Sequence, residues 1–520
     1  MSRSLGKVPK GLLSSLNEIE STHLTLSHPG LTQLLRSFIT RDYDFGAVYA
    51  RLRKIWSIYL TDDDDLSDIY DKSEALATSD EDRRQRSLSP DGETILSPYR
   101  IQARGIWDLY AHRVVPLHFS CQYLGDVWGK PNYWAVSHSW TDPMPGVDTA
   151  VNSYEWPVPL PPEITLEAVR TELLNLGAEY VWLDVLCLRQ FSALPQNEAL
   201  RPKEWAIDVP TIGNVYSDGA SKVVRYYNGL GKAFRKDGWG GERHWLKRAW
   251  TLQEIKYGSV SAGLPSGIVD VLEEKSQDGS TLYDHLDRLL SLEVSLSSHG
   301  DSLRDFMAII QEMRGRYSTN PVDKVAGIGM LLRCPTLPIY RATQTPEQAW
   351  TMCVKHLSPL LQRELLFCFP TPGDQGIKWR VAWDQLMKWT HHISHDGIST
   401  NDLEIGKEGY ASYRGFVLRK CTVSELETPY GDSWYRMIAV EKGGKRMEFK
   451  FITRVGGMLE GGVYTLVGDH DLTSWVVCKW ASQDYMLGRL EKVSVLSMDE
   501  DDAQELRRAG ICRERLVIFR

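Results

Sequence analysis

The chain has 520 residues, a formal net charge of −8, 42% hydrophobic residues and 25% charged residues. A chain of this length folds into more than one domain, and this composition is ordinary for a globular protein. The negative charge argues against a general nucleic-acid binder, and the absence of an apolar run of about 20 residues predicts no membrane-spanning helix.

The cysteines and the first residues bear on location. The eight cysteines are scattered and form no CxxC pair, so the sequence predicts neither a zinc site nor a disulfide framework. Unpaired cysteines are typical of a reducing compartment. The opening stretch MSRSLGKVPKGLLSSLNEIE lacks the apolar core of a signal peptide. We therefore expect a cytoplasmic protein.

The first hundred residues divide into two segments. Residues 1–60 carry apolar residues at helical spacing, which predicts an N-terminal helical segment. Residues 61–97 contain TDDDDLSDIYDK and SDEDRRQRSLSPDGE, whose acidic, polar composition predicts a flexible linker. The aspartates at 62–65 lack the spacing and the glycine of an EF-hand, so a solvated loop is favoured over a cation site.

Residues 98–270 show the pattern of an α/β domain. Short apolar runs at 132–138, 179–185 and 221–227 predict strands buried on both faces, with helical segments between them and a short fourth strand in GSVSAG. Alternation of strands and helices is the signature of a parallel sheet. We expect the three longer strands to be parallel neighbours.

The stretch HWLKRAWTLQEIKYG, residues 244–258, predicts one helix. Leu246, Trp250 and Glu254 are spaced by four residues, so they would share one helical face. A carboxylate on an apolar face is costly to bury unless it is hydrogen-bonded, paired or functional. From this stretch alone, a structural Glu254 held by Arg248 or by backbone donors is favoured over a functional one.

The rest of the chain changes from helices to strands. Residues 271–404 carry helical periodicity and predict a helical region. Residues 405–520 contain six strand-like runs, with Gly443 and Gly444 marking a hairpin, and a short helix near 502–510. This pattern predicts a mostly antiparallel β domain, either a barrel or a sandwich.

Several of these motifs resemble a known family. YWAVSHSW, GAEYVWLDVLCLRQ, AIDVPTIGNVY and KRAWTLQE resemble the fungal HET (heterokaryon incompatibility) domain, and RYSTNPVDKVAGIGML resembles the segment that follows it. The resemblance covers roughly residues 100–370. The stretch EALRPKEWAIDVPTIGNVY departs from the Glu-Arg pair and Met of many HET domains, which puts the packing of that helix in doubt.

The HET domain is in turn similar to TIR domains, which have a flavodoxin-like parallel sheet. Several TIR domains cleave NAD at the nicotinamide–ribose bond, with a catalytic Glu four residues after a Trp. Trp250 and Glu254 match that spacing. The resemblance thus implies a TIR-like (flavodoxin-like) parallel sheet flanked by helices, with Glu254 as the catalytic residue and NAD as a substrate rather than a cofactor.

Other polar residues at the predicted strand ends could bind substrate. Ser137, His138 and Asp184 follow two strands, and the carboxyl ends of parallel strands form the usual binding edge. Asp184 could bind a ribose hydroxyl or cap the next loop. Trp140 could stack on a base or fill the core, and Arg189 could contact a phosphate or remain solvated. A lone histidine after a strand is more often only hydrogen-bonded locally, so this role is favoured for His138.

Two other kinds of site find little support. Cys187 with His138 and Asp184 suggests a cysteine hydrolase, but Cys187 lies in an apolar run without an oxyanion motif. The pieces GLGKAF and GWGG do not have the spacing of a Rossmann dinucleotide fingerprint after a strand. No cluster of ligating residues suggests a metal site.

The resemblance implies an intracellular cell-death or immunity effector of the HET type, acting in innate immunity and programmed cell death. In one interpretation it is an NAD glycohydrolase that acts upon self-association, released by an activating protein partner. In the other it is a non-catalytic TIR-like signalling or scaffold module that acts by oligomerisation. Sequence alone leaves both open.

Overall fold

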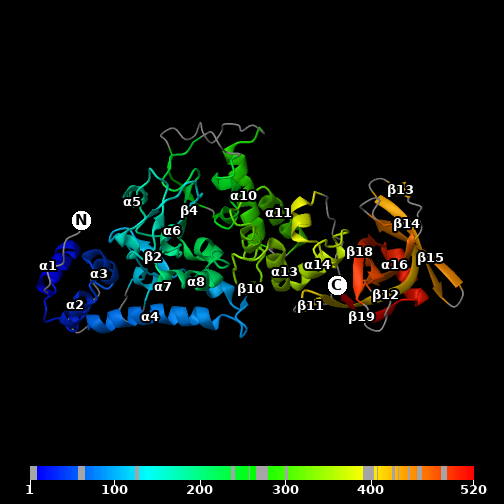
Figure 1. Ribbon diagram of the computed structural model, residues 1–520, viewed down its shortest axis with the longest axis horizontal. Helices are drawn as coiled ribbons and strands as arrows, with labels where there is room; N and C mark the ends of the chain where they lie inside the picture. Colours follow the sequence, from blue (N-terminus) through cyan, green and yellow to red (C-terminus); the bar gives the residue numbers. More distant parts are fainter. Residues whose placement is uncertain are drawn as a thin grey trace. The chain divides into compact units, whose positions relative to one another are not determined.

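The computed structural model describes residues 9–56, 65–122, 128–235, 241–256, 258–264, 279–298, 302–390, 403–406, 408–423, 428–430, 433–442, 445–453, 459–481 and 489–520. The chain divides into two compact units. The α/β unit comprises Met1–Val294, Gly315–Leu331 and Thr336–Thr343, and the C-terminal unit comprises Ser295–Arg314, Leu332–Pro335 and Gln344–Arg520. Figure 1 draws the helices and strands of both units, coloured along the chain from blue at the N-terminus to red at the C-terminus.

The α/β unit contains a six-stranded sheet and the helices around it. Its strands are β2 (Gly105–Asp108), β3 (Arg113–Pro116), β4 (Trp134–His138), β7 (Tyr180–Trp182), β8 (Lys222–Tyr226) and β9 (Val260–Ser261). Its main helices are α1 (Pro9–Glu20), α2 (Leu31–Thr40), α3 (Phe45–Leu52), α4 (Leu66–Arg86), α5 (Leu166–Asn175), α6 (Asp184–Cys187), α7 (Pro195–Glu198), α8 (Arg201–Asp208) and α12 (Asp323–Ala326). Two small strand pairs, β1 (Thr94–Ile95) with β10 (Leu337–Pro338) and β5 (Gly146–Val147) with β6 (Val158–Pro159), complete it.

The sheet order is β3-β2-β7-β4-β8-β9. β7, β4 and β8 are parallel neighbours, which confirms the pairing expected for strands near 132–138, 179–185 and 221–227. β9 adds a fourth parallel strand beside β8. β2 and β3 were not predicted, and they pair antiparallel at the other side of β7, so the sheet is mixed rather than wholly parallel.

Successive residues of the central strands point into two different cores. One core lies between the sheet and the N-terminal helices, and the other lies under α5. The neighbouring pairs that divide in this way are Ile106 and Trp107, Ala135 and Val136, Tyr180 and Val181, and Val223 and Val224. Side chains alternate between the faces of a strand, so a strand with a core on each face has a continuous apolar run. These continuous apolar runs are the feature of the sequence that predicted the strands.

Residues 66–86 correct the prediction of a flexible linker. They form α4, the long blue helix of Figure 1. The carboxylate of Asp65 caps the helix by accepting hydrogen bonds from the backbone N–H groups of Ser67 and Asp68. Leu66, Ile69 and Tyr70 recur at helical spacing and are buried. This apolar stripe is narrow and charged residues surround it, so the hydrophobic pattern of the sequence did not predict the helix. The aspartates at 62–64 lie outside the described residues.

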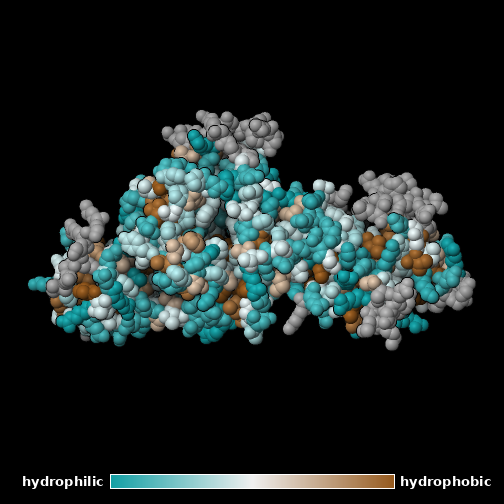
Figure 2. Space-filling model, in the orientation of Figure 1, coloured by the Kyte–Doolittle hydropathy of each residue, from teal (hydrophilic) through white to brown (hydrophobic). Residues whose placement is uncertain are grey.

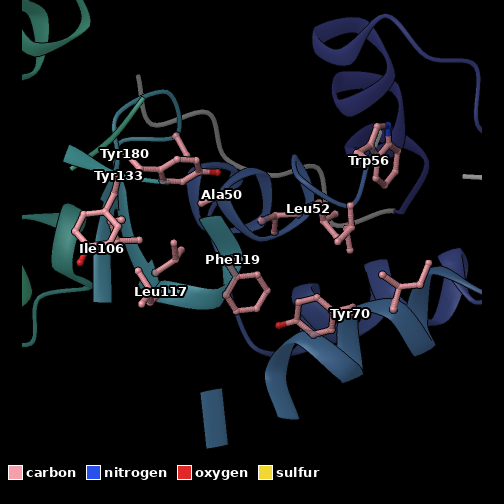
Figure 3. Close-up of a cluster of buried hydrophobic side chains, with 14 of the residues drawn as sticks. Ala50, Leu52, Trp56, Tyr70, Ile106, Leu117, Phe119, Tyr133 and Tyr180 are labelled. Atoms are coloured by element: carbon pink, nitrogen blue, oxygen red, sulfur yellow. The ribbon is translucent and has the colours of Figure 1, made fainter. Parts of the chain in front are cut away.

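The N-terminal helices share a core with the sheet. Figure 3 shows part of this core, where Tyr70 of α4 lies near Phe119, with ring centroids 5.9 Å apart. Trp56 and Leu52 enter the same cluster from the segment around α3. Residues 1–60 were predicted to be helical, and α1, α2 and α3 confirm helices there. Their packing makes them part of the sheet's own hydrophobic core.

A buried ion pair joins the end of α3 to the sheet. The Nε atom of Arg53 lies 2.5 Å from Oδ2 of Asp108, and its Nη1 atom lies 2.5 Å from Oε1 of Glu179. Asp108 is completely buried, and its other oxygen accepts a hydrogen bond from the N–H of Ala111. Lys54 also contacts Glu179, from a more exposed position. The guanidinium group therefore supplies the positive charge that the buried Asp108 requires.

The C-terminal unit combines helices with a nine-stranded sheet. Its helical elements are α11 (Leu303–Arg314), α13 (Pro346–His356), α14 (Pro359–Phe367), α15 (Trp383–Lys388) and α16 (Glu500–Ala509), and α10 (Leu282–Ser298) spans the boundary between the units. The strands are β11 (Leu403–Ile405), β12 (Ala411–Val423), β13 (Thr428–Tyr430), β14 (Ser433–Lys442), β15 (Lys445–Thr453), β16 (Gly462–Gly468), β17 (Ser474–Trp480), β18 (Leu490–Ser497) and β19 (Arg513–Phe519).

The sheet of the C-terminal unit is antiparallel except for the contact of β18 with β19. The pairings β12–β16–β17–β18–β15–β14 return to β12, so these strands form a closed ring. Of the two predicted forms, the pairing is that of a barrel. The predicted hairpin pairs Lys442 with Lys445, while Gly443 and Gly444 lie outside the described residues. The predicted short helix is α16, and Gly510 ends it with a positive φ of 59°.

The face of the molecule in Figure 2 is mainly hydrophilic. On the face in Figure 2, hydrophobic residues form small groups separated by hydrophilic ones. Within the described part of the chain, no helix combines the length and the apolar character that crossing a membrane demands.

Replacement of Arg53 by Met should destabilise the α/β unit by about 3 kcal/mol, because it leaves the buried Asp108 carboxylate without its counter-charge. Lys54→Met is the matched control. It removes a more exposed cation from Glu179 and should cost less than about 1 kcal/mol. Urea unfolding of both full-length variants measures the difference. Equal losses would show that the Arg53–Asp108 pair has no special role.

Candidate functional site

Polar side chains gather at the carboxyl end of β4. Ser137 is fully buried, and its hydroxyl donates a hydrogen bond to Oε2 of Glu254. The indole Nε1 of Trp245 donates to the same hydroxyl, at 2.6 Å. Glu254 is 7% exposed and Trp245 is fully buried. The structure thus brings Ser137 and Glu254 together, although 117 positions separate them in the chain.

The segment that carries Glu254 is not the single helix that the sequence predicts. Only two short 3₁₀ turns form there, at Trp245–Lys247 and Trp250–Leu252. The turns continue to Glu254, whose N–H donates to the carbonyl of Thr251. Residues three apart eclipse one another in a 3₁₀ turn, so Glu254 lies over Thr251 rather than over Trp250. The predicted shared face of Trp250 and Glu254 is therefore wrong.

Trp250 belongs to a neighbouring cluster. A hydrogen bond from its side chain reaches Asp323, whose carboxylate also accepts a hydrogen bond from Tyr340, at 2.7 Å. The buried Arg316 holds the segment of Glu254 from the other side. Its Nη1 atom donates to the carbonyl of Arg248 and to the hydroxyl of Thr251, both at 2.8 Å. These tertiary contacts stabilise the 3₁₀ geometry.

Burial dominates the ionisation of Glu254. Loss of water raises the pKa of its carboxyl to about 7, and the negative charge of Asp184 acts in the same direction. The hydrogen bond from Ser137 and the positive charges of His138 and Arg316 oppose the rise only in part. A glutamate that is partly protonated near neutral pH is a hallmark of functional sites, where proton affinity is tuned by the environment.

His138 and Asp184 form a buried ion pair beside this carboxyl. Nε2 of His138 lies 2.7 Å from Oδ1 of Asp184, and its Nδ1 lies 3.2 Å from the carbonyl of Ser139. Both ring nitrogens face acceptors, as a doubly protonated imidazolium requires. Burial opposes the charge on His138, but the Asp184 carboxylate raises its pKa above the ordinary value. Burial raises the pKa of Asp184, but the positive charge of His138 and the hydrogen bonds to the carboxylate outweigh burial. The pKa of Asp184 therefore lies below its ordinary value.

Asp184 also organises its own loop. Its Oδ2 accepts a hydrogen bond from the indole of Trp140 at 2.8 Å, and its Oδ1 accepts one from the N–H of Val185 at 2.8 Å. The ring of Trp140 stacks on His138, with centroids 6.3 Å apart. Ser137, His138, Trp140 and Asp184 thus lie together as the strand-end argument predicts. The second contact lies within the first turn of α6, of which Asp184 is the first residue, and the N-cap position belongs to Leu183, so the predicted capping role of Asp184 is not seen.

Arg189 lies apart from this group. Its guanidinium contacts Glu155 and Glu204, each at 2.9 Å, and lies over the ring of Trp156. Two carboxylates already neutralise it, so the structure does not present it as a phosphate contact.

The thiol of Cys187 is not activated. Burial raises its pKa to about 12, and the ring of His138 is turned to Asp184 and Ser139. The cysteine-hydrolase alternative therefore has no base for its nucleophile. Among the residues that the structure describes, no group of three or more His, Cys, Asp or Glu side chains could hold a metal ion.

Sequence reasoning missed two residues of this site. Trp245 was considered only as part of a helix, although its indole is the second partner of Ser137. Arg225 lies in β8 directly beside Ser137 in the parallel register, and its guanidinium lies 4.5 Å from the ring centroid of Trp245. The available signal was a charged residue inside an apolar strand, in SKVVRYYNG.

Comparisons of the chain with known protein families, with curated proteins and with solved structures find no match.

Glu254→Gln should stabilise the fold at about pH 8 and change little at about pH 5. The raised pKa means that the protonated carboxyl favours folding, and this contribution is lost as the pH rises through about 7. Gln keeps the shape without the charge. The shift corresponds to about 3 kcal/mol at the higher pH, measured as the difference in urea unfolding between variant and wild type.

Asp184→Asn is the control of opposite sign. The lowered pKa of Asp184 means that its ionised form stabilises the fold above its ordinary pKa, so the Asn variant should be less stable than wild type at both pH values. A Glu254→Gln variant that is destabilised at about pH 8 would show instead that the ionised carboxylate is a satisfied structural group.

Proposed function

We propose that the chain is a cell-death or immunity effector of the HET type that cleaves NAD at the nicotinamide–ribose bond upon self-association. The observation that carries the proposal is the buried carboxyl of Glu254, with a pKa near 7, next to Ser137 at the carboxyl edge of parallel strands. Binding sites of open parallel sheets form at this edge. The HET-like sequence motifs supply the assignment to the family.

The strand order supports a TIR-like core. Across the sheet the parallel strands follow the order β7-β4-β8-β9. When they are numbered along the chain, with β4 as strand 1 and β7 as strand 2, this order is 2-1-3-4. The flavodoxin-like order begins in the same way, 2-1-3-4, with its binding crevice at the switch between strands 1 and 3. Here that switch lies between β4 and β8, where Ser137 pairs with Arg225. The antiparallel β2 and β3 have no counterpart in that order.

The chemistry requires one available carboxylate. The bond between C1′ of the ribose and the nicotinamide nitrogen breaks, both electrons leave with nicotinamide, and C1′ develops oxocarbenium character. Glu254 stabilises this positive charge in a site with little water, where the interaction is strong. Water then bonds to C1′, and its proton passes to the carboxylate. Asp184 does not compete, because His138 already neutralises it.

The burial of Glu254 explains why the proposal includes assembly. Only 7% of the residue is exposed, so NAD reaches the carboxyl only after the surrounding segments move apart. We assign this opening to self-association, which an activating partner triggers. The cationic nicotinamide ring would then favour the ionised form of Glu254 and prepare it for the reaction.

The alternative is a non-catalytic TIR-like scaffold that acts by oligomerisation. The observation that favours it is the same closed geometry, in which Ser137 and Trp245 form a continuous hydrogen-bonded chain to Glu254. In that case the polar cluster specifies one arrangement of the sheet edge, and the chain needs no substrate.

Purified full-length protein should release nicotinamide from NAD when crowding promotes assembly, and Glu254→Gln should lose at least about tenfold of that activity, or about 1.4 kcal/mol of barrier. The amide keeps the shape but cannot stabilise the oxocarbenium charge. Glu167→Gln, which changes an exposed carboxylate on α5, is the control and should retain activity. Absence of turnover in all three proteins, with self-association intact, would establish the scaffold function.

The NAD-cleaving activity should also depend on pH. The active form of Glu254 is ionised, and its pKa near 7 predicts that kcat/KM for NAD rises with pH and levels off above about pH 8. Initial rates of nicotinamide release between about pH 5.5 and 8.5 measure this profile. A flat profile across that range would contradict the assignment of Glu254 as the stabilising carboxylate.

A further inference from the structure

Arg225 is a buried arginine without a carboxylate partner among the described residues. It is 5% exposed, and within the part of the chain that the structure describes its Nε atom has no hydrogen-bond partner. Its Nη1 atom makes one long contact, 3.4 Å to the hydroxyl of Tyr227. The ring of Trp245 lies under the guanidinium at 4.5 Å, which stabilises a cation without neutralising it.

Two other buried arginines, Arg84 and Arg380, are paired with carboxylates, whereas the buried Arg316 donates to a carbonyl and a hydroxyl instead. Arg84 is 3% exposed, and its Nη1 lies 3.1 Å from Oδ2 of Asp80. Arg380 is 1% exposed, and its Nη2 lies 2.9 Å from Oε1 of Glu347. A buried charge without a counter-charge is costly, so proteins keep one mainly where it acts on something else. Arg225 departs from the pattern that these two arginines follow.

The position of Arg225 indicates what it acts on. In the parallel register it lies opposite Ser137 on β4 and Ser261 on β9. The Ser137 hydroxyl contacts Glu254, and the hydroxyl of Ser261 lies 3.1 Å from that of Tyr227. In the sheet register Arg225 therefore lies between Ser137 and Ser261, and Ser137 is the residue that contacts the Glu254 carboxyl.

We infer that Arg225 binds a phosphate group of the ligand that occupies the site beside Glu254, so that the site selects phosphorylated ribosides. The planar guanidinium offers paired N–H donors that match the oxygen atoms of a phosphate. The neighbouring hydroxyl groups supply further hydrogen bonds. The inference rests on the proposed function for the ribose next to Glu254, whereas the phosphate follows from Arg225 itself.

Calorimetric titration of the full-length protein, under the crowding that promotes assembly, with ADP-ribose, ribose 5-phosphate and ribose tests the inference without any turnover. Wild-type protein should bind the two phosphorylated probes at least tenfold more tightly than ribose. Arg225→Met, which replaces the guanidinium group with a shorter, uncharged chain, should lose that preference. Arg225→Lys should retain part of it, because the charge remains while the paired donors are lost.

Stability separates a binding role from a structural one. Arg225→Met should have an unfolding midpoint at or above that of wild type, because it removes an uncompensated buried charge. Arg84→Met is the matched control. It should lower the midpoint, since it removes the buried cation that contacts both Asp80 and Asp208, and keep the preference for phosphorylated probes.

Equal binding of ribose and ribose 5-phosphate by wild-type protein, or an undiminished preference in Arg225→Met, would overturn the inference. A lower midpoint of Arg225→Met with unchanged binding would assign Arg225 to the fold alone. Failure of the proposed function is distinguishable from these outcomes: ADP-ribose would bind through Arg225, while NAD would release no nicotinamide.

Discussion

The desolvation of one carboxyl group at the edge of the sheet is the constraint on which the site depends. Glu254 lies against Ser137, and the loss of water raises its pKa to about 7. The neighbouring Asp184, by contrast, is neutralised by His138, and its pKa is lowered. Glu254 and Asp184 are thus two neighbouring acids whose pKa values shift in opposite directions. This arrangement is typical of sites in which each acid has its own chemical role.

The sheet makes this arrangement possible. The parallel strands β7, β4 and β8 end at the same edge, so a serine and a histidine on β4 meet an aspartate that follows β7. Two hydrophobic cores hold the strands in place, and the N-terminal helices are part of one of them. The Arg53–Asp108 pair ties those helices to the sheet. This packing and the ion pair thereby hold in place the strand ends that carry the polar residues.

The sequence predicted the central strands because both of their faces are buried, which leaves an apolar run that periodicity detects. It also placed Ser137, His138 and Asp184 together, because strand ends converge. It could not predict α4, whose buried stripe is narrow within a highly charged segment. It also could not distinguish a 3₁₀ turn from an α-helix at Trp250, because contacts such as that of Arg316 with Thr251 decide the geometry. The partners of Glu254 and of Arg225 likewise depend on tertiary structure.

The central claim is that Glu254 exchanges its proton near neutral pH, and infrared difference spectroscopy tests it most directly. Spectra of wild-type protein between about pH 6 and about pH 8 should show the carbonyl band of one buried carboxylic acid disappear as the pH rises. The same band should be absent from the difference spectrum of Glu254→Gln. Identical spectra for the two proteins would show that Glu254 does not titrate in this range, and would contradict the account.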